Sequence, residues 1–135
     1  MTEEFHDRWI LELRGSPVVS IVVSRDFDRH ETVLVLEYDS LLEIKGQAFL
    51  TQGASSAPGA VRLPDEEWQG LVGATVVSAV AFKSGALRVV FSTGHHMNVP
   101  SQGSDVVIHI RRLGRFDWFY HDGVGVMRVF GTPAS

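Results

Sequence analysis

The chain has 135 residues, 44% of them hydrophobic and 21% charged, with a formal net charge of −4 at neutral pH. This length and composition are typical of one soluble globular domain, so we expect residues 1–135 to form a single domain. The absence of cysteine excludes disulfide bonds, thiolate metal sites and a cysteine nucleophile, and the acidic balance argues against a nucleic-acid partner.

The first eight residues are mostly polar and include three acidic side chains. They lack the basic start and the apolar stretch of a secretory signal. No later apolar run approaches the roughly 18 residues of a membrane span. The sequence therefore predicts a cytoplasmic protein with no membrane contact.

The N-terminal part of the chain predicts three strands. Alternating apolar and polar side chains over Trp9–Leu13 indicate a half-buried strand, and the Gly-Ser-Pro sequence at 15–17 forces a turn. The β-branched run Val18–Ser24 is a second strand. A polar connection at 25–30 then leads to a third strand over Thr32–Tyr38.

The third predicted strand is apolar on both faces. Val33 and Val35 lie on one face, and Leu34 and Leu36 lie on the other. A strand of this kind is usually central in a sheet and covered on both sides. If only one side is covered, the second face is expected to be an interface.

Two segments of the chain are copies of each other. Leu13–Val23 reads LRGSPVVSIVV and Leu71–Ala81 reads LVGATVVSAVA, with six of the eleven positions identical. In the next strand we align Leu34, Leu36 and Tyr38 with Leu87, Val89 and Phe91. We place the first pseudo-repeat at about 9–50 and the second at about 64–100, an arrangement that suits two halves covering each other's apolar faces.

The region between and within the copies carries three further predictions. Residues 51–60, TQGASSAPGA, lack any apolar period and predict a mobile loop. Pro64–Trp68 has the acidic first turn of a short helix, with Trp68 packed inward. In the second copy we expect a tight hairpin at 83–85 between two strands. The side chains predicted to share one face of the first strand are Val76, Ser78, Val80 and Phe82. Those predicted on the core face of the second strand are Leu87, Val89 and Phe91.

The C-terminal part, at 105–130, adds an unrepeated hairpin element. Strands are predicted over Asp105–Ile110, Arg115–Tyr120 and Val124–Phe130, and Asp122-Gly123 is a strong hairpin turn. In all, about ten short strands and one short helix predict a mainly β fold. The expected architecture is a pseudo-symmetric antiparallel sandwich or partly open barrel.

The second copy also carries a recognisable order of turn glycines and core residues. It reads Leu71-x-Gly73-x-x-Val76-x-Ser78-x-x-x-Phe82-x-x-Gly85-x-Leu87-x-x-x-Phe91-x-x-Gly94, followed by Trp118 and the Gly-rich turn at 123–125. This pattern resembles a family of small bacterial proteins known only as a domain of unknown function. The pattern is a fold signature and carries no catalytic residue. Because such families often neighbour bacterial toxin systems, the resemblance implies an immunity role as one expectation.

Three histidines are candidate ligand or metal residues. His95 and His96 are adjacent, so on a strand they point to opposite faces, and a solvated loop pair is the favoured interpretation. His109 lies in an apolar strand. It is either an edge or core histidine bonded to a backbone group, which we favour, or a site residue together with His96.

Acidic residues give two weaker candidates. Asp26, Asp28 and His30 alternate in one connection, but the further oxygen ligands of a calcium loop are absent, so a charged hairpin tip is favoured. Glu37 with Glu43 or Asp39 could form a carboxylate pair, although solvated residues are the simpler interpretation. The sequence predicts no metal and no cofactor.

One basic cluster is followed directly by aromatic residues. Such a cluster can bind single-stranded nucleic acid or anchor a protein interface. The alternative is that the aromatic side chains are core and the arginines are solvated. The interaction candidates are Arg111, Arg112, Arg115, Trp118 and Tyr120.

No nucleophile motif or phosphate-binding loop is present, so the sequence leans away from an enzyme. The favoured function is a non-catalytic protein-interaction domain, either immunity-type or homodimeric. A small-ligand-binding β-barrel lined by Trp9, Trp68 or Trp118 is the alternative. An enzyme that uses His95, His96 or His109 ranks third.

Overall fold

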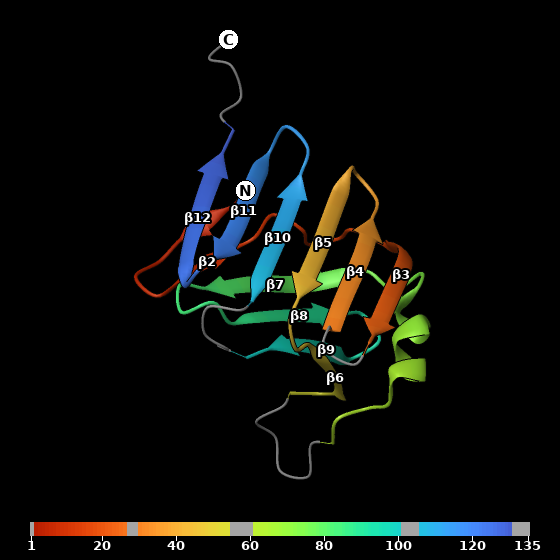
Figure 1. The fold of residues 1–135 in the computed structure, drawn as a ribbon. Helices are drawn as coiled ribbons and strands as arrows, with labels where there is room; N and C mark the ends of the chain where they lie inside the picture. Colours follow the sequence, from red (N-terminus) through yellow and green to blue (C-terminus); the bar gives the residue numbers. More distant parts are fainter. Residues whose placement is uncertain (1, 27–29, 55–60, 101–105, 131–135) are drawn as a thin grey trace.

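The computed structural model describes residues 2–26, 30–54, 61–100 and 106–130, and within them two six-stranded antiparallel sheets pack face to face (Figure 1). The front sheet of Figure 1 has the order β12 (Val124–Val129), β11 (Phe116–His121), β10 (Val107–Arg112), β5 (Ser40–Lys45), β4 (His30–Leu36), β3 (Val18–Arg25). The rear sheet has the order β1 (Glu3–Glu4), β2 (Arg8–Ile10), β7 (Val76–Phe82), β8 (Leu87–Phe91), β9 (His95–Val99), β6 (Phe49–Gln52). The strands of the two sheets cross at a steep angle in the view of Figure 1, as in orthogonally packed sandwiches.

This arrangement confirms the prediction of a mainly β sandwich, and the sheets do not close into a barrel. The structure also contains β1 and β6, which the sequence pattern did not predict. β2 is shorter than expected because it ends at Ile10. Leu11 and Leu13 lie beyond its end but are still buried.

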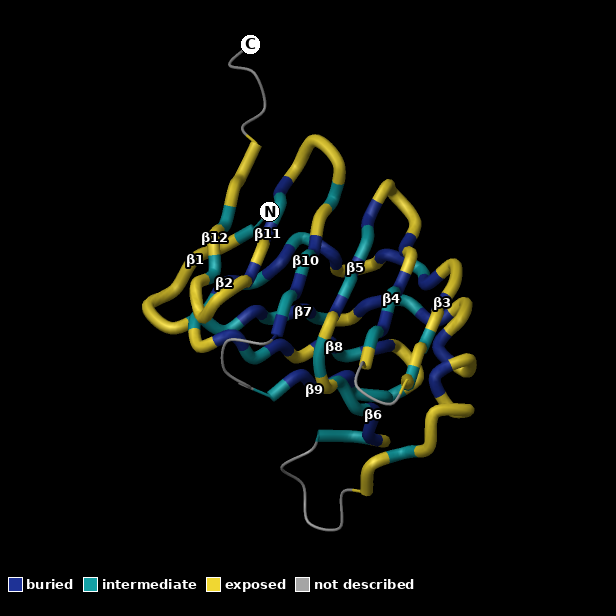
Figure 2. The backbone as a smooth tube through the Cα atoms, in the orientation of Figure 1, coloured by how far each residue is buried: buried dark blue, intermediate teal, exposed yellow. Residues whose placement is uncertain are grey.

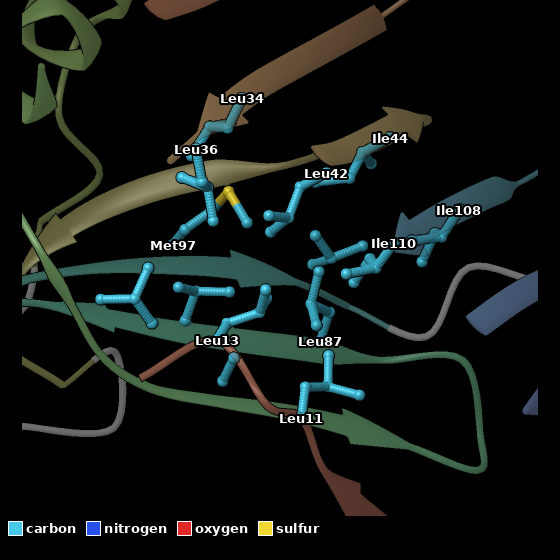
Figure 3. Close-up of a cluster of buried hydrophobic side chains, with 14 of the residues drawn as sticks. Leu11, Leu13, Leu34, Leu36, Leu42, Ile44, Leu87, Met97, Ile108 and Ile110 are labelled. Atoms are coloured by element: carbon cyan, nitrogen blue, oxygen red, sulfur yellow. The ribbon is translucent and has the colours of Figure 1, made fainter. Parts of the chain in front are cut away.

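The space between the sheets is filled by one hydrophobic cluster (Figure 3). Leu34 and Leu42 of the front sheet and Met97 of the rear sheet are fully buried within it. Trp9 and Trp118 also meet there, with ring centroids 6.2 Å apart. The three tryptophans considered as the lining of a ligand cavity are all core residues. Trp9 is 8% exposed, Trp68 1% and Trp118 0%.

The strand registers show which residues of the two copies are equivalent. β3–β4–β5 and β7–β8–β9 are equivalent three-stranded units, and each has a register shift at the same point, between Val18 and Ser20 and between Val76 and Ser78. Leu36 pairs with Val18 as Phe91 pairs with Val76. The predicted alignment of Tyr38 with Phe91 is therefore wrong by two residues.

The correct partner of Phe91 is Leu36 because the front-sheet strand ends earlier than predicted. Tyr38 and Asp39 have positive φ values of 64° and 54° and form the turn between β4 and β5. Tyr38 is 64% exposed there.

The register shift also corrects the predicted face of β7. A β-bulge adds one residue to a strand and reverses the alternation beyond it. Val76 is buried with Ala79 and Ala81, whereas Ser78 and Val80 lie on the opposite face. The predicted grouping of Val76 with Ser78 and Val80 is therefore wrong. The predicted core face of β8, in contrast, is confirmed.

A backbone joint connects the starts of β3 and β7 at one corner of the sandwich. Pro17 and Thr75 form an isolated antiparallel bridge. The amide of Val18 donates to the carbonyl of Ala74 at 2.8 Å, and the amide of Val76 donates to the carbonyl of Ser16 at 2.9 Å. Because these residues are equivalent in the two copies, the joint has a local pseudo-twofold symmetry.

The connection between the copies differs from the prediction at its start. Residues 51 and 52, expected in a loop, belong to β6, and residues 55–60 lie outside the described residues. The predicted helix is present as a 3₁₀ helix, η1 (Asp65–Leu71), beside β3 (Figure 1). Its Trp68 is buried as predicted. None of the helices among the described residues has the length and apolarity needed to cross a membrane.

Candidate functional site

The outer face of the front sheet carries several exposed apolar side chains. Alternating residues of its strands point away from the rear sheet, as Figure 2 shows by the change between buried and exposed positions along each strand. Several of these outward residues are large and apolar. Val22 is 58% exposed, Val35 38%, Phe119 43% and Val126 51%.

The pairing of neighbouring strands sets the outward residues in rows across the sheet. One row runs through Val22, Val33, Glu43, His109, Phe119 and Val126. The next row runs through Ser20, Val35, Leu41, Arg111, Asp117 and Arg128. We call these two rows the outer-face rows. They combine apolar side chains with charges of both signs, which is the composition of a protein contact surface.

A histidine–carboxylate pair lies at the centre of the outer-face rows. Nε2 of His109 is 2.5 Å from Oδ1 of Asp117, on the neighbouring strand. The side chains are 27% and 32% exposed. The ring of Phe119 meets the His109 ring edge-on, with centroids 5.5 Å apart. The partner of Nε2 of His109 is therefore a carboxylate side chain, whereas the sequence favoured a backbone group.

His109 and His96 do not share a site. His109 is on the outer face of the front sheet, whereas His96 belongs to β9 of the rear sheet, where it pairs with Val90 and Thr51. The prediction that His95 and His96 form a solvated loop pair is also wrong. Both residues are half-buried in β9, and Nδ1 of His95 is 2.7 Å from the Thr93 hydroxyl.

His96 has a distinct environment. Its Nδ1 is buried and has no hydrogen-bond partner among the described residues. Burial lowers the pKa of His96 below its ordinary value of 6.5, and the positive charge of Arg88 lowers it further. Both effects favour the neutral ring. Leu41, the front-sheet equivalent of His96 by register, is apolar.

A surface hollow of about 600 Å³ opens at one end of the outer face. It lies beside the β4–β5 turn and is lined by Val35, Leu36, Glu37, Tyr38, Asp39, Ser40, Leu41, Arg111 and Leu113. Leu113, in the β10–β11 turn, is 68% exposed. Arg111 is exposed and has no ion-pair partner within the described part of the chain.

The other four predicted interaction residues have contacts inside the domain. The Arg112 guanidinium donates to the hydroxyls of Ser16 and Ser40, and its Nε lies 3.0 Å from Ser40 Oγ. Arg115 forms a two-pronged ion pair with Glu12, at 2.7 and 2.9 Å. This hydrogen-bonded pairing with Arg115 lowers the pKa of Glu12 from 4.5 to about 2.

Trp118 and Tyr120 lie on the buried face of β11 and are 0% and 4% exposed. Tyr120 donates from its hydroxyl to the Ser84 carbonyl at 3.3 Å, so it connects the front sheet to the β7–β8 turn. The residue between them, Phe119, points outward instead. Of the five predicted interaction residues, Arg111 is therefore the one on the outer face without an internal partner in the described structure.

The acidic candidates are not brought together as ligands. Among the described residues, no group of three or more His, Asp or Glu side chains is placed to hold a metal ion. Asp26 and His30 are exposed, and Asp28 lies outside the described residues. Glu37 and Asp39 line the hollow, whereas Glu43 is in the outer-face row beside His109.

Sequence reasoning missed Phe119, Val126 and Leu113 as surface residues. The alternation of β11 contained the signal for Phe119, because a strand with Trp118 and Tyr120 in the core must turn Phe119 outward. No comparable signal predicted that β5 pairs with β10, a contact between distant segments that builds the outer-face rows.

Comparison with known proteins gives one match. The model of a family of unknown function, DUF6188, matches residues 9–105, which cover both copies and end before β10. No curated protein and no solved structure shows significant similarity to the chain. Since the matched region is well over half of the 135 residues, the chain belongs to the family of unknown function DUF6188.

Proposed function

We propose that this protein is a non-catalytic protein-interaction domain that docks a partner protein on the outer face of its front sheet. One observation carries the proposal: β4 is covered by the rear sheet on one side and presents Val33 and Val35 on the other. Solvated faces of antiparallel sheets normally carry polar residues. An apolar face without a covering layer is the common mark of an interaction site.

The chemistry of the hollow defines the kind of partner we propose. Val35, Leu41 and Leu113 line it with apolar surface, and Arg111 stands at its side. An apolar anchor residue of the partner would bury its side chain in the hollow, and a neighbouring carboxylate would pair with Arg111. Anchors of this kind supply most of the binding free energy of protein interfaces.

The His109–Asp117 pair supports a structural role within this face. Asp117 fixes the orientation of the His109 ring, which in turn packs against Phe119. No serine or threonine is paired with His109 in the two outer-face rows. The proposed role of the pair is to hold Phe119 in a defined position for contact with the partner.

The partner to test first is the protein encoded by the neighbouring gene, because an immunity-type role predicts a toxin there. The two proteins are co-expressed, purified as a complex and titrated by calorimetry. We expect Leu113→Asp and Arg111→Glu each to weaken binding at least about tenfold, the effect of losing an anchor contact of about 1.4 kcal/mol.

Val61→Asp is the matched control. Val61 is 67% exposed, almost the same as Leu113 at 68%, but lies in the segment before η1 and not on the front sheet. It should bind like the unmodified protein. Equal binding by Leu113→Asp, Arg111→Glu and Val61→Asp would remove the outer face as the docking site. Failure to form any complex with the neighbouring gene product would contradict the immunity-type role.

A further inference from the structure

The sandwich has four edge strands, β3 and β12 in the front sheet and β1 and β6 in the rear sheet. An edge strand has a row of N–H and C=O groups that can pair with another chain. Proteins shorten, charge or cover their edge strands to prevent such pairing. Among the described residues, β1, β3 and β6 have this protection and β12 does not.

Each protected edge has an identifiable device. β1 has two residues, both exposed glutamates. On β3, Gly73 donates to the carbonyl of Val18 at 2.9 Å, and the Gln69 side chain donates to the carbonyl of Ile21 at 3.2 Å. On β6, the amide of Leu63 donates to the carbonyl of Leu50 at 2.8 Å.

β12 has the opposite properties. It is six residues long, contains no proline and carries one charged side chain, Arg128. Val124 is 61% exposed, Val126 51% and Val129 59%, and no residue of the strand is buried (Figure 2). A long, apolar, β-branched edge of this kind is a template for strand addition.

The outward backbone groups of β12 follow from its pairing with β11. The amide of Phe130 donates to the carbonyl of Arg115 at 2.9 Å, and hydrogen-bonded positions alternate along an antiparallel pair. The backbone groups of Val126 and Arg128 therefore point toward β11. Those of Gly125, Met127 and Val129 point away from the sheet.

We propose that β12 pairs with β12 of a second copy of this chain, antiparallel and about a twofold axis at Met127, to form one continuous sheet across a homodimer. In this register Met127 faces Met127 of the partner, and Gly125 faces Val129 of the partner. Every outward N–H and C=O of the three residues then has a hydrogen-bond partner. A symmetric interface closes after two copies, so the assembly stops at a dimer.

The side chains select this register over its neighbours. Centred on Met127, the pairing sets Arg128 opposite Val126 of the partner, while Asp117 remains beside Arg128 within each chain. A register centred on Arg128 would place two arginines opposite each other, which is unfavourable. A register centred on Val126 would leave the backbone groups of Val129 unpaired.

This dimer is a separate inference from the proposed docking function. It uses the backbone of β12, whereas the partner protein is expected at the hollow beside the β4–β5 turn. β12 also lies beyond residues 9–105, the region matched by the family model. The oligomeric state and the binding of a partner protein therefore test the two proposals independently.

The first measurement is light scattering after size exclusion, over a range of concentrations of the full chain. We expect a mass of twice the 14.9 kDa of one chain at high concentration, falling toward 14.9 kDa on dilution. A single-chain mass at all concentrations would overturn the inference, and so would open-ended aggregates.

Amide hydrogen exchange gives a residue-level test. We expect the amides of Gly125, Met127 and Val129 to be protected at concentrations where the dimer forms and to exchange rapidly after dilution. The amides of Val126 and Arg128 should stay protected at both concentrations, because β11 holds them. A dimer in which this alternation is missing would be formed by another surface, and the inference would be wrong.

Met127→Pro removes the outward N–H at the twofold axis, and proline is tolerated at such positions of edge strands. We expect the dimer dissociation constant to rise at least about tenfold, with the far-ultraviolet circular dichroism of the monomer unchanged. Val126→Lys gives a second variant that should also dissociate the dimer, since it sets a lysine beside Arg128 of the partner.

Val22→Lys is the matched control for Val126→Lys. Val22 is 58% exposed on β3, at the other end of the same outer-face row. This variant should dimerise like the unmodified chain. If Met127→Pro does not fold, the comparison of Val126→Lys with Val22→Lys decides. Equal dimerisation of these two variants would exclude β12 as the interface.

Discussion

The backbone amide of Gly15 donates a hydrogen bond of 2.7 Å to the carbonyl oxygen of Val76. The equivalent bond of the other copy runs from Gly73 to Val18, at 2.9 Å. Each glycine thus belongs to one copy and binds the first residue of a strand in the other copy, Val76 of β7 or Val18 of β3. The residues that join the two sheets are therefore residues that the sequence duplication repeats.

Substitution of Gly15 or Gly73, which we call the joint glycines, should cost a similar amount of stability. Gly15 has φ +84° and Gly73 has φ +90°, and no atom lies within 4 Å of a Cβ built on either residue. Gly15→Ala and Gly73→Ala should each lower the free energy of unfolding by about 1–2 kcal/mol, through left-handed backbone strain alone. Urea denaturation measures the loss.

Gly70→Ala is the control for these two variants. Gly70 has equal space around it and no positive φ, so alanine should leave the free energy of unfolding nearly unchanged. If Gly15→Ala is harmless while Gly73→Ala is not, the pseudo-twofold account of the joint is wrong.

The parts of the fold set by local pattern could be predicted, and those set by irregular backbone could not. The alternation of β4 correctly set Leu34 and Leu36 on one face and Val33 and Val35 on the other, and the structure shows that the first of these faces is the buried one. It also extended the strand to Tyr38, because the β4–β5 turn uses positive φ at Tyr38 and Asp39 without a glycine to signal it. The prediction for β7 failed for a related reason. The bulge after Val76 reverses which side chains face the core, and one inserted residue leaves no mark in the composition.

The candidate site depended even more on long-range pairing. The pairing of β10 with β5 brings Arg111 beside Leu41, although about seventy residues separate them in the chain. The His109–Asp117 contact, in contrast, was accessible from the sequence. Both residues belong to predicted strands joined by a short turn, and counting outward from that turn places them on one face.

Gly85→Ala should be far more damaging than the joint variants. A Cβ at Gly85 would lie 2.4 Å from Cζ of Tyr120, and the residue has φ +97°. Tyr120 is 4% exposed and bonded to Ser84, so its ring has no free space to move into. We expect a loss of about 2–4 kcal/mol, from overpacking added to backbone strain, in thermal or urea unfolding.

A comparison with Gly114 separates the two causes. Gly114 has φ +75° with no neighbour within 4 Å, so Gly114→Ala carries the backbone strain without the clash. In a Tyr120→Leu background the cost of Gly85→Ala should fall toward that of Gly114→Ala. An unchanged cost in that background would show that the Tyr120 ring is not the obstacle.

His96→Leu should stabilise the protein. The variant installs the residue type of Leu41 in the equivalent position and removes a buried nitrogen that has no described hydrogen-bond partner. Relief of such a group is worth about 1 kcal/mol. Thermal unfolding at neutral pH measures the gain.

The pH dependence of that gain has a defined sign. The pKa of His96 is lowered by burial and then by Arg88, below the ordinary value of 6.5. The unfolded chain therefore binds the proton more readily, and this residue's contribution makes stability fall as the pH drops below 6.5. The advantage of His96→Leu should grow over the same interval. An advantage that shrinks on acidification would contradict the lowered pKa.

The ion pair of Glu12 and Arg115 should govern part of the acid stability. The pKa of Glu12 is lowered to about 2, against 4.5 for an ordinary glutamate, and the hydrogen-bonded pairing with Arg115 is the largest cause. Because the folded chain releases this proton more readily than the unfolded chain, the contribution is fully present above pH 4.5 and is lost as the pH falls toward 2. Glu12→Gln should therefore lower stability at neutral pH and flatten its decline between pH 4.5 and 2. Arg115→Gln should give a smaller flattening, because Glu12 stays ionisable and loses only the largest of the contributions that lower its pKa. Urea midpoints measured across this interval test both variants. Parallel curves for Glu12→Gln and the unmodified chain below pH 4.5 would show that the pair does not supply this acid sensitivity.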